Sequence, residues 1–189
     1  MDGVVHPESK GHLLEYVRSL WYCSSLGNVV RDFPWSFREC FSTLPNLHNF
    51  ELNGVRVERV REEEFRACFS AFRETLTHLS LVFLSTSSST FMILINCFPG
   101  ITTLRLCSPE LEPDYGPVPS LSLSLRGKVC IQDFGGRANG SKFLNRFAKL
   151  DLGYEELSIG PLFTETRFLE NALQISTNIL KFLRLAVEF

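Results

Sequence analysis

The sequence predicts an α/β repeat fold with one long parallel sheet, on three observations. First, a short phrase of the form apolar, any residue, apolar occurs seven times at nearly constant spacing. Second, the segments between copies of this phrase carry apolar residues with the period of an amphipathic helix. Third, the connections are short, and a strand, a helix and a further strand joined in this way leave successive strands parallel.

The repeated phrase sets the expected architecture. The seven copies are Leu20-Trp21-Tyr22, Phe50-Glu51-Leu52, Leu79-Ser80-Leu81, Leu104-Arg105-Leu106, Val129-Cys130-Ile131, Leu157-Ser158-Ile159 and Leu183-Arg184-Leu185. Their last residues are separated by 30, 29, 25, 25, 28 and 26 positions, which is the period of leucine-rich repeats. We therefore expect a leucine-rich-repeat-like, right-handed βα solenoid. This horseshoe arc would carry the parallel sheet on its concave side and the helices on its convex side.

The remaining elements follow from the segments between the phrases. Helices are expected at about 35–43, 62–73, 88–98, 141–148 and 165–174. The clearest is 62–73, where three carboxylates precede one apolar face formed by Phe65, Cys68, Phe69 and Phe72. The proline-rich segment 108–120 and the glycine-rich segment 135–140 are expected to be loops. Residues 1–189 would form a single domain of about seven irregular repeats, and residues 1–12 a short N-terminal tail.

Composition argues against several classes of partner. The 21 acidic and 19 basic residues give a net charge of -2 and are spread along the chain, so nothing favours nucleic acid or anionic lipid. No apolar stretch approaches the about 20 residues that cross a bilayer, and the N-terminal residues do not read as a secretory signal. We expect an intracellular protein, cytoplasmic or nuclear, that binds neither nucleic acid nor membrane.

The cysteines are expected to be reduced core residues. The six of them are dispersed through apolar segments without a C-x-x-C pair, which argues against a disulfide framework and against a metal site. Three share a context that predicts a common packing position: Cys40-Phe41, Cys68-Phe69 and Cys97-Phe98.

No catalytic constellation stands out. Neither G-x-S-x-G nor H-E-x-x-H occurs, and the only imidazoles are His6, His12, His48 and His78, of which the last two are expected at the surface. We therefore expect no enzymatic activity and no cofactor. A hydrolase built on loops 108–120 and 135–140 is the least favoured alternative, because neither loop contains a histidine.

A binding surface is expected on the exposed face of the sheet. Because strand side chains alternate, the middle residue of each phrase should point away from the core. These candidate contact residues are Trp21, Glu51, Ser80, Arg105, Cys130, Ser158 and Arg184. The set mixes both charges with an aromatic ring, which suits recognition of another protein. The alternative is that these side chains simply face solvent without a ligand.

Three repeats carry a family resemblance. The segments 44–52, 75–81 and 98–106 resemble the leucine-rich repeats of the F-box-like proteins of mushroom-forming fungi. The resemblance implies a substrate receptor, in which an F-box docks to the Skp adaptor of a cullin ubiquitin ligase while the repeats hold the target. It covers the repeat region only and no F-box is present, so the adaptor is expected as a partner only if an F-box lies upstream of this chain. A degenerate or truncated paralogue without selected function is the alternative.

The chain departs from the common repeat pattern at one recurrent position. Those repeats place an asparagine three residues after the apolar phrase, where its side chain satisfies the backbone of the turn. Here the corresponding residues in copies two to five are Val55, Leu84, Pro109 and Phe134. We expect the turns to be satisfied in another way and the arc to be less regular.

Overall fold

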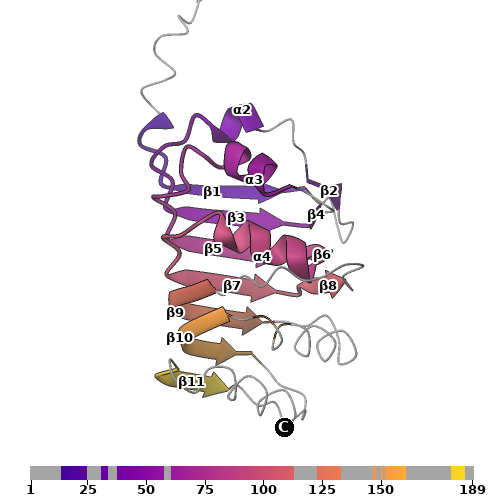
Figure 1. The fold of residues 1–189 in the computed structure, drawn as a ribbon. Coiled ribbons are helices and arrows are strands. Elements are labelled where there is room, and N and C mark those ends of the chain that lie inside the picture. The colour runs from indigo at the N-terminus through magenta and orange to yellow at the C-terminus, as the bar shows by residue number, and fades with distance from the viewer. Residues whose placement is uncertain are drawn as a thin grey trace, which may run out of the picture.

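The fold is known from a computed structural model of residues 1–189, which describes residues 14–24, 31–33, 38–57, 61–112, 123–132, 147, 150, 152–160 and 180–185. Its main feature is a seven-stranded sheet with every pairing parallel. The strands lie side by side in chain order (Figure 1). They are β1 (Ser19–Cys23), β3 (Asn49–Asn53), β5 (His78–Val82), β7 (Thr103–Cys107), β9 (Leu123–Gln132), β10 (Leu152–Ile159) and β11 (Phe182–Leu185).

Each of the seven apolar phrases lies inside one of these strands. The prediction of an α/β fold with a long parallel sheet is therefore confirmed. The reason is visible in the burial pattern of β3, β5 and β7, where the two apolar residues of the phrase are buried and the residue between them is not.

A second parallel sheet was not predicted. Its four strands, in order, are β2 (Arg31–Asp32), β4 (Val55–Val57), β6 (Ser85–Ser87) and β8 (Glu110–Glu112). The expectation of a loop over 108–120 is wrong at β8, although residues 113–120 lie outside the described part of the chain. The apolar residues found in place of asparagine explain this sheet. Val55, Leu84 and Pro109 are buried, and the short strands that begin at Val55 or directly after the other two satisfy the backbone that an asparagine would otherwise serve.

The turn between the two sheets has the same geometry in three repeats. Gly54, Phe83 and Ser108 each adopt a positive φ, of 69°, 48° and 46°. The backbone N–H of each donates across to the next repeat: to the Val82 carbonyl at 2.9 Å, the Cys107 carbonyl at 2.9 Å and the Gln132 carbonyl at 3.1 Å. Glycine takes this conformation without strain, whereas the other two residues do not.

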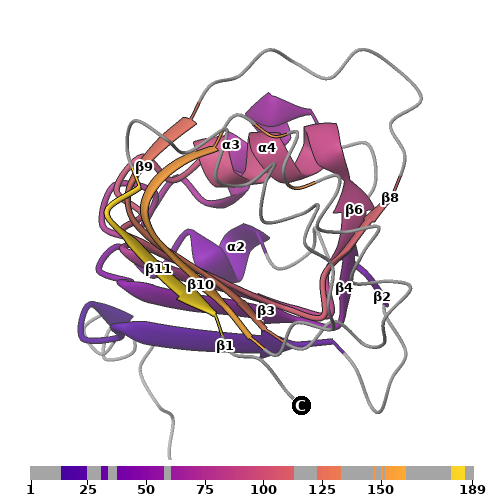
Figure 2. The same cartoon turned by 90° about the horizontal axis from the view of Figure 1, so that it is seen from below.

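The helices lie on one side of the seven-stranded sheet, and the four-stranded sheet adjoins them (Figure 2). The two sheets and the helices together surround one interior. They are α2 (Arg38–Phe41), α3 (Glu62–Cys68) and α4 (Ser88–Asn96). At the start of α4, the Ser87 hydroxyl accepts a hydrogen bond from the Thr90 N–H at 3.2 Å and so caps the helix.

The expected helix positions are only partly correct. The helix over 88–98 is confirmed, but the one over 62–73 ends at Cys68. Turns then follow, because Phe72 and Leu76 must also enter the core, where both are fully buried. The segment 35–43 is helical at Arg38–Phe41, while residues 165–174 and all of 141–148 except the helical Phe147 lie outside the described residues.

Phenylalanine rings form the centre of the core. Phe69, fully buried, has its ring centroid between 5.2 and 6.0 Å from six others, belonging to Phe33, Phe41, Phe50, Phe65, Phe72 and Phe98. Phe69 itself belongs to one of the three recurrent Cys-Phe pairs, and its ring contacts those of the other two pairs, Phe41 and Phe98. The prediction that these pairs share a packing position is therefore confirmed for their phenylalanines.

The cysteines are less uniform than predicted. None of the six, all of which lie in the described part of the chain, forms a disulfide, but only Cys68 and Cys97 are buried, whereas Cys107 and Cys130 are partly buried and Cys23 and Cys40 are exposed. The core assignment is wrong for Cys23 because it lies on the outward side of β1, and for Cys40 because it lies on the outward side of α2. Burial raises the pKa of Cys68 to about 12 and that of Cys97 to about 11.

Truncation of the central ring should unfold the protein readily. We expect Phe69→Ala to lower the free energy of unfolding by about 3–5 kcal/mol, because it leaves a cavity among six rings. The control is Phe83→Ala, since that side chain is 44% exposed and should cost far less. Urea denaturation of both variants checks the difference, and similar midpoints would contradict the ring stack as the centre of the core.

A glycine in β9 should resist any side chain. A Cβ at Gly127 would lie 1.9 Å from the Thr102 carbonyl oxygen, whereas at Gly100 the nearest atom, the Leu76 carbonyl oxygen, would be 3.2 Å away. We expect Gly127→Ala to destabilise the protein by about 3 kcal/mol and Gly100→Ala by about 1 kcal/mol or less. Thermal unfolding of the two variants tests this order, which a larger loss at Gly100 would reverse.

Candidate binding face

The seven residues predicted to point away from the core lie in one continuous row. The register of the parallel strands pairs Trp21 with Glu51, Glu51 with Ser80 and Ser80 with Arg105, and continues in the same way to β11. We call this set the central row, and its members are Trp21, Glu51, Ser80, Arg105, Cys130, Ser158 and Arg184. The structure thus brings all the candidate residues together.

A second row, not singled out from the sequence, lies earlier in each strand. We call it the N-terminal row, and it consists of Ser19, Asn49, His78, Thr103, Lys128, Glu156 and Phe182. The signal was present in the sequence, because residues two positions apart in a strand share a face. The face of the seven-stranded sheet that carries both rows is called the open face below.

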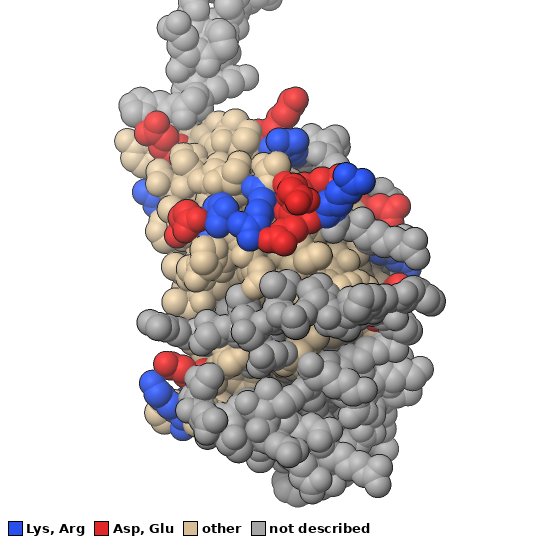
Figure 3. Space-filling model, viewed as in Figure 1, with Lys and Arg blue, Asp and Glu red and all other residues tan. Residues whose placement is uncertain are grey.

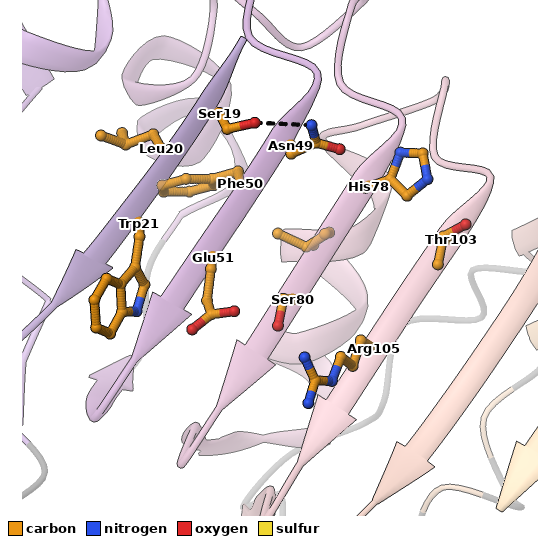
Figure 4. Close-up of a pocket in the computed structure, with 11 residues that line it drawn as sticks. Ser19, Leu20, Trp21, Asn49, Phe50, Glu51, His78, Ser80, Thr103 and Arg105 are labelled. Carbon is orange, nitrogen blue, oxygen red and sulfur yellow. Dashed lines mark hydrogen bonds between the residues drawn. The ribbon is translucent and has the colours of Figure 1, made fainter. Parts of the chain in front are cut away.

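The open face is hollowed over β1, β3, β5 and β7 (Figure 4). The hollow has a volume of about 400 Å³ and is lined by residues of both rows, with Leu20, Phe50 and Leu79 completing the lining. Figure 4 shows the central row along the C-terminal part of these strands and the N-terminal row at their start. There the Asn49 amide Nδ2 donates to the Ser19 hydroxyl at 2.9 Å, which fixes one end of the hollow.

Charges are arranged differently at the two ends of the open face. Towards β11, the Glu156 carboxylate lies 2.9 Å from the Lys128 ammonium and 4.0 Å from the Arg184 guanidinium. In the hollow, by contrast, Glu51 and Arg105 form neither a hydrogen bond nor an ion pair within the described part of the chain. Two opposite charges are therefore left without partners, on either side of Ser80.

Ser80 is unusual among the polar residues of this face. Its Oγ is shielded from solvent and has no hydrogen-bond partner within the part of the chain that the structure describes. A shielded hydroxyl without a partner is costly, by about 1–3 kcal/mol. Figure 4 shows it between Glu51 and Arg105, so that the hollow contains a hydrogen-bonding group as well as two charges.

Large aromatic side chains mark the two ends of the open face. Trp21 in β1 is 67% exposed and Phe182 in β11 is 65% exposed. Exposed rings of this size are typical of surfaces that bind other proteins. Trp21 belongs to the lining of the hollow, so the apolar group and the unpartnered charges are available to the same ligand.

Cys130 lies in the central row next to Arg105. It is partly buried, and this burial raises its pKa, so that the neutral thiol predominates at neutral pH. At this position the central row therefore presents a neutral thiol, which behaves as a small apolar group with a weak donor.

Both described histidines were expected at the surface, and only one of them lies there. His78 is exposed and its Nδ1 is 2.9 Å from the Thr77 hydroxyl, but His48 is half-buried. The His48 Nδ1 donates to the Asn46 carbonyl at 2.7 Å. The glycine-rich segment 135–140 lies outside the described residues.

Other kinds of site find no support in the described ranges. No group of three or more histidine, cysteine or acidic residues there could hold a metal ion. None of the described helices is long and apolar enough to cross a membrane, and α4, with nine residues, is the longest of them. On the side of the molecule with the helices, acidic and basic side chains lie next to one another (Figure 3). The sequence matches no protein-family model, and no curated protein matches it.

Removing the Ser80 hydroxyl should stabilise the protein. We expect Ser80→Ala to raise the free energy of unfolding by about 1 kcal/mol, because it removes a shielded group that lacks a partner. The matched control is Thr86→Val, which removes a buried hydroxyl that donates to the Val57 carbonyl at 2.8 Å and should destabilise. Urea denaturation gives both values, and a loss of stability in Ser80→Ala would show that this hydroxyl has a partner after all.

Proposed function

We propose that this chain is a non-enzymatic protein-binding domain and that its open face holds a segment of a partner protein. The observation that carries the proposal is the hollow on this face, where Glu51 and Arg105 have no partners among the described residues and Trp21 is exposed. Interfaces are enriched in tryptophan and arginine, and their buried charges need partners of opposite sign. A segment of a second protein that fills the hollow would supply such partners for Glu51 and Arg105.

For the fold, we infer a right-handed βα solenoid of the leucine-rich-repeat type, with the open face on the concave side of its arc. The support is that each strand of the long sheet pairs with the next one along the chain at intervals of one repeat. In this arrangement the concave side of the arc forms an extended surface of the kind that repeat proteins use for binding. It suits an extended contact with a target.

The resemblance to F-box-like proteins gives the proposal a biological form. The chain would act inside the cell, in the cytoplasm or nucleus, as the target-holding part of a ubiquitin-ligase receptor. The Skp adaptor would be a second partner only where an F-box precedes these repeats. Nothing in this role requires a cofactor, and the mixed charge of the chain does not favour nucleic acid.

Charge reversal within the central row tests the proposal. We expect Arg105→Glu to reduce capture of the partner at least about tenfold, because it replaces the cation that would pair with the partner's anion by a like charge. Arg184→Glu should have a smaller effect, since Glu156 already lies 4.0 Å from that guanidinium. The measurement is quantitative affinity purification of the tagged chain and its variants, with captured proteins identified by mass spectrometry.

A matched control lies on the helical side. Glu63→Lys reverses a charge on an exposed residue of α3 and should leave capture unchanged. All variants should melt within a few degrees of the parent chain, because the residues are exposed or half-exposed. Equal capture by the parent chain, Arg105→Glu and Arg184→Glu would contradict binding through the open face.

A further inference from the structure

The spacing of the unpartnered charges in the hollow constrains what can bind there. Glu51 is on β3 and Arg105 is on β7, and the register places one strand, with Ser80, between them. Neighbouring strands are about 4.8 Å apart, so the two side chains start about 10 Å apart. Neither neutralises the other, because no ion pair joins them. A ligand that satisfies both must therefore carry a cation and an anion about 10 Å apart on one side.

The size of the hollow favours a single extended chain. Its volume is about 400 Å³. An extended segment is narrower than the diameter of about 10–12 Å that an α-helix has with its side chains, so its backbone comes closer to the strands that form the floor of the hollow.

Two extended conformations differ in the spacing of side chains on one side. In a β-strand, residues two apart share a side and are about 6.7 Å apart, which is too short for Glu51 and Arg105. In polyproline II helix, residues three apart share a side and are about 9 Å apart, since the rise is about 3.1 Å per residue. The second spacing matches the separation of the two charges.

The remaining groups in the hollow fit the same conformation. A polyproline II backbone makes no internal hydrogen bonds, so its carbonyl oxygens are free to accept from the protein. The Ser80 hydroxyl is a donor without a partner among the described residues, and it becomes accessible when the side chains that shield it turn towards the ligand. Trp21 lies beside Glu51 at the outer end of the row, and polyproline segments pack apolar residues against exposed aromatic rings. The polar and apolar groups therefore fall in a fixed order along the row.

We propose that the open face binds a polyproline II segment of its partner. The segment carries a basic residue against Glu51 and, three positions later, an acidic residue against Arg105. The apolar residue directly before the basic one lies against Trp21, which is one strand away from Glu51. It crosses the strands of the sheet, and one of its carbonyl oxygens accepts a hydrogen bond from the Ser80 hydroxyl. This inference rests on the proposed function and specifies the chemistry of the target.

Two peptides of identical composition test the order of the charges. Both have blocked ends and a fluorescent label. The first reads Leu-Pro-Pro-Lys-Pro-Pro-Glu, and the second exchanges its lysine and glutamate. We expect the first to bind the parent chain at least tenfold more tightly in fluorescence anisotropy. The double variant Glu51→Arg/Arg105→Glu should reverse this preference, and its melting curve checks that it is folded.

Three outcomes would overturn the proposal. The first is equal affinity of the two peptides. The second is failure of both peptides to bind while capture of a partner still depends on Arg105, which leaves the proposed function intact and removes only the polyproline segment. The third is a dimer in sedimentation equilibrium that Arg105→Glu dissociates, which would assign the open face to a second copy of the chain. If capture also proves independent of Arg105, the proposed function fails as well.

Discussion

The parallel register between successive strands is the constraint on which both sides of the molecule depend. It aligns the middle residues of the seven phrases in one row, and in β3, β5 and β7 it places their apolar neighbours in the core. A slip of one residue in any strand would exchange the two sides. For β3 and β7 it would place Glu51 and Arg105 among the buried phenylalanines, and an unpaired charge in such surroundings is prohibitively costly. Glu51 and Arg105 therefore contribute both to the proposed binding surface on the open face and to the choice of register.

The core and the turns both connect neighbouring repeats, although the repeats differ in length. Phenylalanines from the segments before β3, β5 and β7 meet at Phe69, which links neighbouring repeats by ring contacts rather than by a uniform ladder of leucines. At the other end of each strand, the left-handed residues Gly54, Phe83 and Ser108 turn the chain into the four-stranded sheet. That sheet takes the place of a side-chain ladder, since backbone donors and acceptors are paired between repeats.

Much of this arrangement could be predicted from the sequence because the signal was periodic. The phrases located the seven strands, and the alternation of side chains placed the central row on one face. The second sheet could not be found in this way, since β2 has two residues and β4, β6 and β8 have three each, too few for a periodic pattern. The end of α3 was missed because the helical spacing of Phe65, Phe69 and Phe72 continues past Cys68, while packing bends the chain there. Whether a charged residue of the open face is paired depends on the side chains of the neighbouring strands, and the sequence of one strand does not contain that information.

The distribution of charge on the open face indicates where binding energy can be gained. Lys128 and Glu156 already form an ion pair with each other. A ligand that breaks this pair must replace it, and a ligand that leaves it intact gains no new pairing, so either way the gain in binding free energy is small. Glu51 and Arg105 lose nothing of this kind when a ligand pairs with them. The shielded hydroxyl of Ser80 adds to the difference, because the free protein bears the cost of its missing hydrogen bond and the bound state removes that cost. Stability given up at this one position would thus be recovered on binding, which places the energetic centre of the face over β3, β5 and β7 rather than at its C-terminal end.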